Sequence, residues 1–436
     1  MKVRSLLPGL LAIVSCTAIA VWIAIRAPHH SSQVSDLSFE NWDAQRAASY
    51  LDSREVWWQS WPAAQQERGT VCVSCHTVVP YALVRPTLRT ALRQSGRTAQ
   101  ETAMLTSVEA RVNNWATMQP YYTDANDGPG KSAESHATEA VLNAVILASY
   151  EPGPGMMSPE TKQAFDEAWA LQEKTGRDAG GWEWQNFHLA PWESDESAYQ
   201  GAAMFAIAVG SAPEQYTAQT DAAQHIVQLR DYLRQHYATQ PVMSQVYVLW
   251  ASSRMPGLLS EKEKASLIKR LRELQMRDGG WALTTLDEQP GLRPYLKNEW
   301  NLLRGATRSD GCATGLVTVA LEQAGLTSQD KLLRQGLEWL DRHQRQDGSW
   351  QAFSLNSDRD PNSDIGRFMS DAATGYAVMA LTGARSEGNI PHHEEASATV
   401  RGTICLPTIN GPDHCRIQDS GSGISLPRPA VAATSQ

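Results

Sequence analysis

The sequence predicts an all-α protein built from consecutive helical hairpins, on two observations. From about residue 98 onward, charged amphipathic stretches with helical periodicity alternate with stretches rich in small apolar residues. An amphipathic helix suits an outer layer, and a helix that is apolar on most sides suits an inner layer. Successive apolar stretches begin roughly 50–65 residues apart, a spacing typical of helical repeats.

The expected hairpins follow one another along the chain, with loops rich in Gly, Pro, Asp and Asn between them. Their first and second helices are expected at 98–115 and 135–149, 159–176 and 195–209, 220–237 and 242–253, 260–276 and 310–324, and 328–344 and 371–382.

The chain begins with a segment typical of a membrane anchor. Lys2 and Arg4 precede an apolar run from 6 to 25, which is about long enough to cross the hydrocarbon core of a bilayer as a helix. Positive charge before the run favours export of everything after it. We interpret residues 1–30 as an uncleaved signal anchor that holds the body on the periplasmic, extracytoplasmic face. The alternatives are a signal-peptidase site at 18–20 and a lipoprotein box at 13–16, and both also export the body.

Residues 31–96 are predicted to form a small helical segment around a short motif. Residues 43–64 have helical periodicity, which places Trp57 and Trp61 one turn apart on the same face. The motif itself is Cys72-Val73-Ser74-Cys75-His76, in which two thiols three positions apart are followed at once by a histidine.

This C-x-x-C-H spacing is the attachment signature of a c-type haem. Each thiol adds across one vinyl group of the porphyrin, and the histidine is then held beside the iron as its ligand. We therefore expect covalent haem c at Cys72 and Cys75, with His76 as metal ligand. The alternatives are a lone redox dithiol, half of a zinc site, or two ordinary cysteines. Export favours the haem, because c-type haem is attached outside the cytoplasm.

The sixth ligand of the iron has three nearby candidates, Met104, Met118 and His136. Met118 directly follows a predicted helix, where a thioether can turn toward the haem, so we favour Met118 as the second metal ligand. An open sixth position is the alternative.

Three loops share a turn. Residues 275–281 and 344–350 both read Q-x-x-x-G-x-W, and 172–182 is a looser copy. The glycine supplies a positive φ after the outer helix, the indole stacks over helix ends, and the glutamine bonds backbone groups left open there. This turn resembles the QW motif of the squalene–hopene cyclase family. The resemblance covers about residues 98–384 and implies an α/α-toroid whose apolar central cavity suits an isoprenoid or lipid ligand.

The chain departs from that family where the chemistry is concentrated. Squalene-cyclising members protonate an alkene with a D-x-D-D run, which is missing here; the nearest run is 358–361. Asp310 and Asp371 remain as catalytic candidates. The alternative is an ordinary structural role, because both, like Asp195, are expected to open an inner helix, where a carboxylate caps free N–H groups. Asp310-Gly311-Cys312 resembles part of the zinc site of protein prenyltransferase β subunits, but alanines fall where that site has its histidine.

The composition limits the choice of partners. A net charge of −9, without a basic run or basic-aromatic patch, argues against a nucleic-acid partner.

Residues 385–436 are rich in Gly, Pro and Ser and are expected to be disordered. In an oxidising compartment Cys405 and Cys415 are placed to close a loop, which leaves Cys312 as a buried free thiol.

Three hypotheses for function follow. The leading one is a membrane-anchored extracytoplasmic haem protein that passes electrons to a redox partner, or does haem redox chemistry on an apolar ligand held in the toroid. The second is a cyclase or other isoprenoid-transforming enzyme that carries a haem. The third is a non-catalytic haem protein that binds lipid, so whether the chain is an enzyme stays open.

Overall fold

The computed structural model describes residues 39, 41–118, 128–153, 156–287, 308–356 and 359–388. Within these ranges every named element is a helix, and β-structure is confined to two isolated bridges, which confirms the predicted all-α class. The described residues all belong to one compact unit, Met1–Asn389. None of the described helices has the length and hydropathy needed to cross a membrane. The anchor expected at 1–30, the loop closed by Cys405 and Cys415, and the tail beyond 388 lie outside the described residues.

The long helices alternate along the chain between a mostly buried and a half-exposed kind. The mostly buried ones are α3 (Val78–Ala91), α5 (Gly128–Ser149), α7 (Ser197–Val209), α10 (Val242–Ala251), α14 (Gly311–Gln323) and α16 (Phe368–Gly388). The half-exposed ones are α2 (Ala44–Ser60), α4 (Ala99–Asn113), α6 (Pro159–Ala170), α9 (Thr220–His236), α11 (Glu261–Leu274) and α15 (Lys331–Arg342). The alternation expected from hydrophobic patterning is therefore present.

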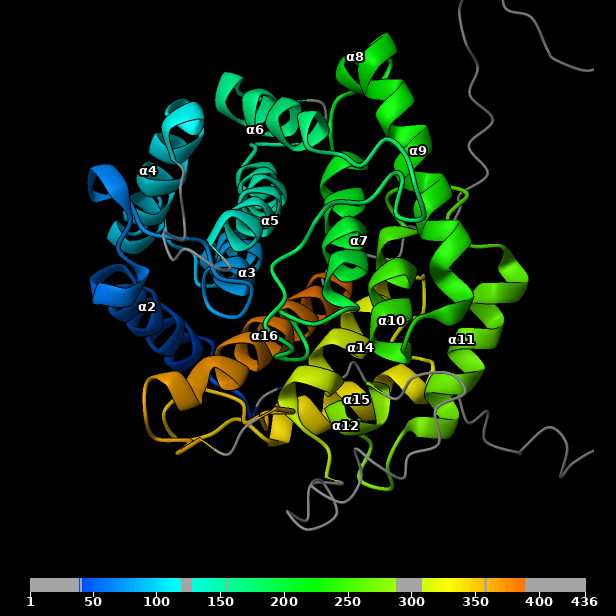
Figure 1. Ribbon diagram of the computed structural model, residues 1–436. Coiled ribbons are helices and arrows are strands. Elements are labelled where there is room, and N and C mark those ends of the chain that lie inside the picture. Colours follow the sequence, from blue (N-terminus) through cyan, green and yellow to red (C-terminus); the bar gives the residue numbers. More distant parts are fainter. Residues whose placement is uncertain are drawn as a thin grey trace, which may run out of the picture. The chain divides into compact units, whose positions relative to one another are not determined.

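The buried helices pack against one another in a closed succession. Helix α3 packs on α5, α5 on α7, α7 on α10, α10 on α14, α14 on α16, and α16 returns to α3 (Figure 1). Each half-exposed helix packs against one or more of these: α2 on α3 and α16, α4 and α6 on α5, α9 on α7, α11 on α10, and α15 on α14 and α16. Shorter elements lie between them: η1 (Pro62–Ala64), η2 (Glu67–Gly69), η3 (Trp115–Thr117), α8 (Glu214–Thr217), η4 (Tyr237–Thr239), α12 (Leu283–Leu286) and η5 (Ile365–Arg367).

Two buried helices begin earlier than predicted. Helix α5 begins at Gly128 rather than at 135, because the proline that follows this glycine is tolerated in the first turn, where its missing N–H is not needed. Helix α16 begins at Phe368, directly after η5, so Asp371 lies in the first turn of the helix rather than at its N-cap.

The N-terminal pair, α2 and α3, joins the same succession of contacts. We expected residues 31–96 to form a segment of their own beside a toroid at 97–384. In the structure α3 packs between α16 and α5 although Pro86 lies inside it, and α2 packs on α3 and α16. The C-x-x-C-H motif, which lies between these two helices, is thereby held by the same body as the repeated hairpins.

The Q-x-x-x-G-x-W turns have the roles predicted for their glutamine and glycine. At 344–350, Gly348 has φ 91°, and the Nε2 of Gln344 donates to the Gly348 carbonyl at 3.1 Å. The same Nε2 donates to the carbonyl of Asp43, the N-cap of α2, at 2.9 Å. The Trp350 indole donates to the Leu340 carbonyl of α15, at 2.8 Å. Each turn therefore bonds its own outer helix and the next one.

The other two turns repeat this pattern. The corresponding glutamine bonds are from Gln275 to Gly279 and Leu332 of α15, and from Gln172 to Gly180 and His225 of α9. The corresponding indole bonds are from Trp281 to Leu271 and from Trp182 to Ala168.

The turn at 344–350 helps to join the two ends of the described chain. Besides the bond from Gln344 to the carbonyl of Asp43, the Asp43 N–H donates to Gln344 Oε1 at 2.6 Å. Nearby, the buried carboxylate of Asp341 accepts the N–H groups of Asn41 and Trp42, at 3.1 and 3.3 Å. These contacts bring together residues about 300 positions apart in sequence.

Candidate functional site

The C-x-x-C-H motif lies in a pocket of about 450 Å³. Cys72, Cys75 and His76 line it, together with residues from α5, from 184–193 and from 354–369. Its volume falls in the range of small-molecule and cofactor sites. Segments from three distant parts of the sequence thus converge on the motif.

Local hydrogen bonds shape the motif. The hydroxyl of Ser74 accepts the N–H groups of Thr77 and Val78, at 3.2 and 3.0 Å, and so satisfies free donors at the start of α3. The Trp58 indole donates to the carbonyl of Cys72, at 2.8 Å, and the Cys72 N–H donates to that of Ala64, at 2.9 Å. The two thiols are thereby held between α2 and α3.

Aromatic rings surround the histidine. The His76 ring stacks on Phe368, with ring centroids 3.8 Å apart, and meets Trp58 edge-on at 5.3 Å. Trp58, Phe368, Trp61 and Trp192 all line the pocket. Trp57 of α2 stacks at 5.1 Å on Trp61, which directly follows the helix, so the two indoles lie on the same side although α2 ends at Ser60. The pocket wall beside His76 is therefore largely apolar.

His76 is neutral at pH 7. Burial lowers its pKa to about 3, and the nearby charges of Arg54 and Arg359 act in the same direction. Its Nδ1 lies 2.9 Å from the hydroxyl oxygen of Thr77. Its Nε2 makes no hydrogen bond to any described residue. A neutral imidazole with one nitrogen already paired is the form in which histidine binds a metal.

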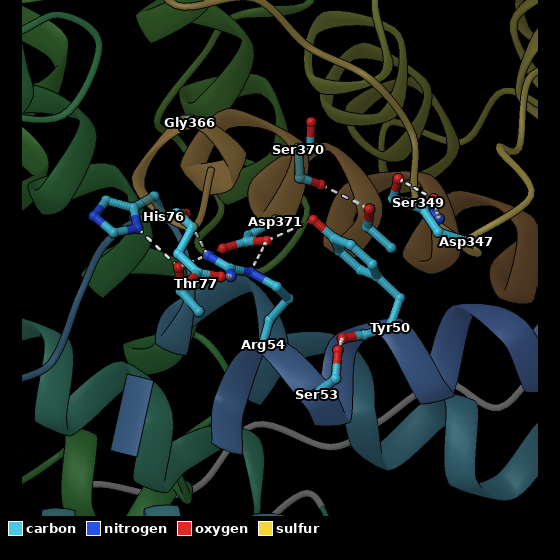
Figure 2. A network of polar contacts seen from close by, with 12 residues as sticks. Tyr50, Ser53, Arg54, His76, Thr77, Asp347, Ser349, Gly366, Ser370 and Asp371 are labelled. Carbon is cyan, nitrogen blue, oxygen red and sulfur yellow. Dashed lines mark hydrogen bonds and ion pairs between the residues drawn. The ribbon is translucent and has the colours of Figure 1, made fainter. Parts of the chain in front are cut away.

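Asp371 lies behind His76 rather than in the pocket. Figure 2 shows its carboxylate among Thr77, Arg54 and Tyr50. The Thr77 hydroxyl donates to Oδ2 at 2.8 Å, while Tyr50 and the Nε of Arg54 donate to Oδ1 at 2.7 and 2.8 Å. Our prediction that Asp371 opens and caps a helix is wrong, because α16 starts before it and these three partners are side chains. Burial raises its pKa, and Arg54 opposes that shift.

The buried guanidinium of Arg54 links this carboxylate to a second one. Its terminal nitrogens donate to the Asp364 carboxylate at 2.8 Å and to the carbonyl of the same residue at 2.7 Å. It also lies over the ring of Trp57, 4.4 Å from the centroid. The side chain of Arg54 is therefore fixed on three sides.

Asp310 caps the start of a helix, which is the structural role expected from the sequence as the alternative to catalysis. It is the N-cap of α14, and its carboxylate accepts the N–H groups of Cys312, Ala313 and Leu283, at 3.0, 2.9 and 2.6 Å. Burial raises its pKa to about 6, against the effect of these three donors. Asp310 does not line the pocket, and neither does Asp371. Asp195, by contrast, is exposed and accepts a bond from Asn186.

The candidates for the sixth ligand do not line the pocket. Met118 is buried after η3, Met104 is buried in the core, and His136 stacks on Trp115 with centroids 4.1 Å apart. A different thioether, that of Met369 in α16, does line the pocket. Met118 as a metal ligand stays a prediction.

The two thiols of the motif favour their protonated form. Cys72 and Cys75 are not joined in a disulfide, and burial raises the pKa of both, that of Cys72 to about 12. A dithiol that exchanges disulfides depends on a lowered thiol pKa. Among the described residues no three His, Cys, Asp or Glu side chains are grouped to hold a metal ion. A haem needs no such group, because the porphyrin supplies four ligands to its iron.

Several site residues could not be found from sequence patterns. Thr77 directly follows the motif, and Tyr50 and Arg54 are spaced to share one face of α2, but the carboxylate that they bond is about 300 residues away. Glu193 and Arg359 line the pocket from loops without periodicity. These contacts join residues that are distant in sequence. They depend on how the hairpins pack, so a local sequence pattern does not predict them.

Comparison with protein-family models gave no match to this chain, and comparison with curated proteins found none that is similar.

Proposed function

We propose that this chain is a c-type haem protein whose haem is linked to Cys72 and Cys75 and ligated by His76. One observation carries the proposal: a single pocket contains both thiols and a neutral imidazole whose Nδ1 is already engaged. The cysteines are free to form two thioethers. Nε2 is the nitrogen left to bind iron.

The pocket fits a porphyrin in its chemistry as well as its ligands. The indoles of Trp58, Trp61 and Trp192 supply apolar walls of the kind that cofactor sites use. Arg359 and Asn356 line the same pocket and suit the carboxylates that a haem carries at its edge. A haem bound there supplies a redox-active iron, while these residues hold it and limit its exposure to water.

We also propose that the helices form an α/α-toroid that serves as scaffold for the haem. The closed succession of contacts among α3, α5, α7, α10, α14 and α16, with the half-exposed helices packed on them, supports this arrangement. So do the three turns of QW type, each of which bonds its own outer helix to another. The family resemblance implies a central cavity for an isoprenoid. In this proposal that cavity is the pocket that holds the haem.

The redox role follows from these two proposals. A membrane-anchored haem protein on the extracytoplasmic face passes electrons to a redox partner, or does redox chemistry on an apolar ligand beside the haem. A cyclase is supported less well, because neither Asp310 nor Asp371 lines the pocket and both carboxylates are engaged elsewhere.

The test is covalent attachment. The full chain, produced with a c-type maturation system, should keep its haem through denaturation and acid–acetone extraction. The double variant Cys72→Ala, Cys75→Ala should lose all covalent haem, whereas Cys312→Ala, which removes a buried thiol elsewhere, should keep it. Haem that survives extraction in the double variant, or a wild-type chain that takes up none, contradicts the proposal.

A further inference from the structure

We propose that Asp371 is a positioning residue for the iron ligand His76: through the hydroxyl of Thr77 it fixes the imidazole tautomer that presents Nε2 to the haem, and it makes the iron harder to reduce. This inference rests on the haem function proposed above. It assigns a role to two residues that lie outside the C-x-x-C-H motif.

The direction of each hydrogen bond follows from what the groups can donate. An ionised carboxylate only accepts, so the hydroxyl hydrogen of Thr77 points to Asp371 Oδ2, 2.8 Å away. The Thr77 oxygen is then the acceptor for the Nδ1–H of His76, at 2.9 Å. A neutral imidazole carries one N–H, so Nε2 keeps its lone pair. The chain of contacts thus selects one tautomer.

Asp371 is held in its ionised form by its surroundings. The guanidinium of Arg54 is always charged, lies 2.8 Å from Oδ1 and is itself 2 % exposed. Tyr50 donates to the same oxygen at 2.7 Å, which leaves Oδ2 for Thr77 (Figure 2). With Asp371 itself 1 % exposed, water does not replace these partners.

This arrangement has an electronic consequence for a metal at Nε2. A histidine whose N–H is bonded toward a carboxylate is a more basic ligand and donates more electron density. Greater electron density favours the oxidised iron over the reduced one. Removing the Thr77 hydroxyl or the Asp371 charge should therefore raise the midpoint potential.

Three substitutions separate positioning from folding. Thr77→Val keeps the shape of the side chain but removes the hydroxyl, and Thr77→Ser keeps the hydroxyl. Thr318→Val is the matched control, because Thr318 is equally buried and donates only to the carbonyl of Thr314 in its own helix. Asp371→Asn removes the charge directly, but it leaves the buried Arg54 with one carboxylate fewer, so Thr77→Val is the decisive variant.

The first measurement needs no haem. In the full chain produced without the maturation system and labelled with ¹⁵N-histidine, NMR should show His76 with its proton on Nδ1. Thr77→Val should give a mixture of tautomers, and Thr77→Ser and Thr318→Val should give the wild-type signals. A proton on Nε2 in the wild type, or an unchanged tautomer in Thr77→Val, overturns the proposal.

The second measurement is the midpoint potential of the haem-loaded chain. Thr77→Val should shift it to a more positive value, Thr77→Ser should restore it, and Thr318→Val should leave it unchanged. Equal potentials in Thr77→Val and the wild type overturn the electronic part. If the wild type takes up no haem, the proposed function fails on its own, and the tautomer signals of Thr77→Val and Asp371→Asn still decide whether Thr77 and Asp371 position His76.

Discussion

Glu55 is a carboxyl group that the fold buries without a charged partner among the described residues. Its side chain is fully covered, Oε1 accepts a bond from Gln59 at 2.8 Å, and Oε2 has no hydrogen-bond partner. Burial raises its pKa to about 7, and the charges of Asp371 and Asp52 act in the same direction. Folding therefore favours the protonated form of the Glu55 side chain over the ionised form.

This predicts how stability changes with pH. Between an unfolded pKa of 4.5 and a folded pKa of about 7, the folded chain holds a proton that the unfolded chain has lost. Unfolding releases that proton, so Glu55 lowers stability as pH rises through this window, by up to about 3 kcal/mol. Below pH 4.5 its contribution is constant.

Glu55→Gln should remove this dependence. Urea unfolding from pH 4.5 to 8 should show the variant gaining stability over the wild type as pH rises. Glu214→Gln changes an exposed carboxylate of α8 and serves as the control, with a difference from the wild type that stays nearly constant. Parallel curves for Glu55→Gln and the wild type would mean that the folded state tolerates the ionised side chain.

The hydrogen bonds of two single residues, Asp310 and Asp371, argue against alkene protonation. That reaction needs a strong acid with a proton to give. The oxygens of Asp310 face three backbone N–H groups, and those of Asp371 face Arg54, Tyr50 and Thr77, so both carboxylates act as acceptors. We expect no cyclised product from squalene, measured by mass spectrometry of the extract. A polycyclic product that disappears in Asp310→Asn or Asp371→Asn would reverse this conclusion.

At the scale of the element, the Q-x-x-x-G-x-W turn at 344–350 contains a glycine that has no room for a side chain. Gly348 combines a φ of 91° with close packing, because a Cβ there would lie 2.2 Å from the carbonyl oxygen of Arg46 in α2. Gly257 has a φ of 85° with no atom within 4 Å of the same position. Alanine substitutions at the two glycines therefore distinguish the cost of backbone strain alone from the cost of strain plus steric contact.

Gly257→Ala should therefore cost about 1–2 kcal/mol, the usual penalty for a side chain in the left-handed region. Gly348→Ala should cost more than that, because the turn at 344–350 and α2 must also move apart. The free energy of unfolding in urea measures both. Equal losses in the two variants would show that the turn at 344–350 gives way without disturbing α2.

Helices and turns were predictable because their signals are local. Periodicity located each long helix after residue 98 to within a few residues at most ends, and the Q-x-x-x-G-x-W pattern located the turns. The start of α5 was missed because Pro is common both in loops and at the first positions of helices. The C-x-x-C-H spacing is likewise a local pattern, and the haem that it predicts stays a prediction. The contact between Thr77 and Asp371 is not local, because their partnership exists only after α3 has packed against α16.

At the scale of the whole molecule, the position of the body relative to a membrane stays a prediction. Lys2, Arg4 and the apolar run from 6 to 25 favour export with the N-terminus retained inside. Alkaline phosphatase fused after Gln94 should be active in a bacterial host, and carbonate washing should leave the full chain in the membrane fraction. An inactive fusion protein of normal abundance would reverse the orientation.

The bonds from Asp341 and Gln344 to residues 41–43 affect how the protein unfolds and whether it can gain or lose a hairpin. In an open solenoid each repeat contacts only its neighbours, so terminal repeats fray and whole repeats are gained or lost with little harm. Among the described residues, the first and last hairpins are neighbours, because α16 packs on both α2 and α3. Losing one would expose two faces at once, and adding one would separate residues 41–43 from their partners. Melting should therefore be all-or-none over the described residues between 41 and 388, and a variant with one hairpin duplicated should be less stable than the wild type.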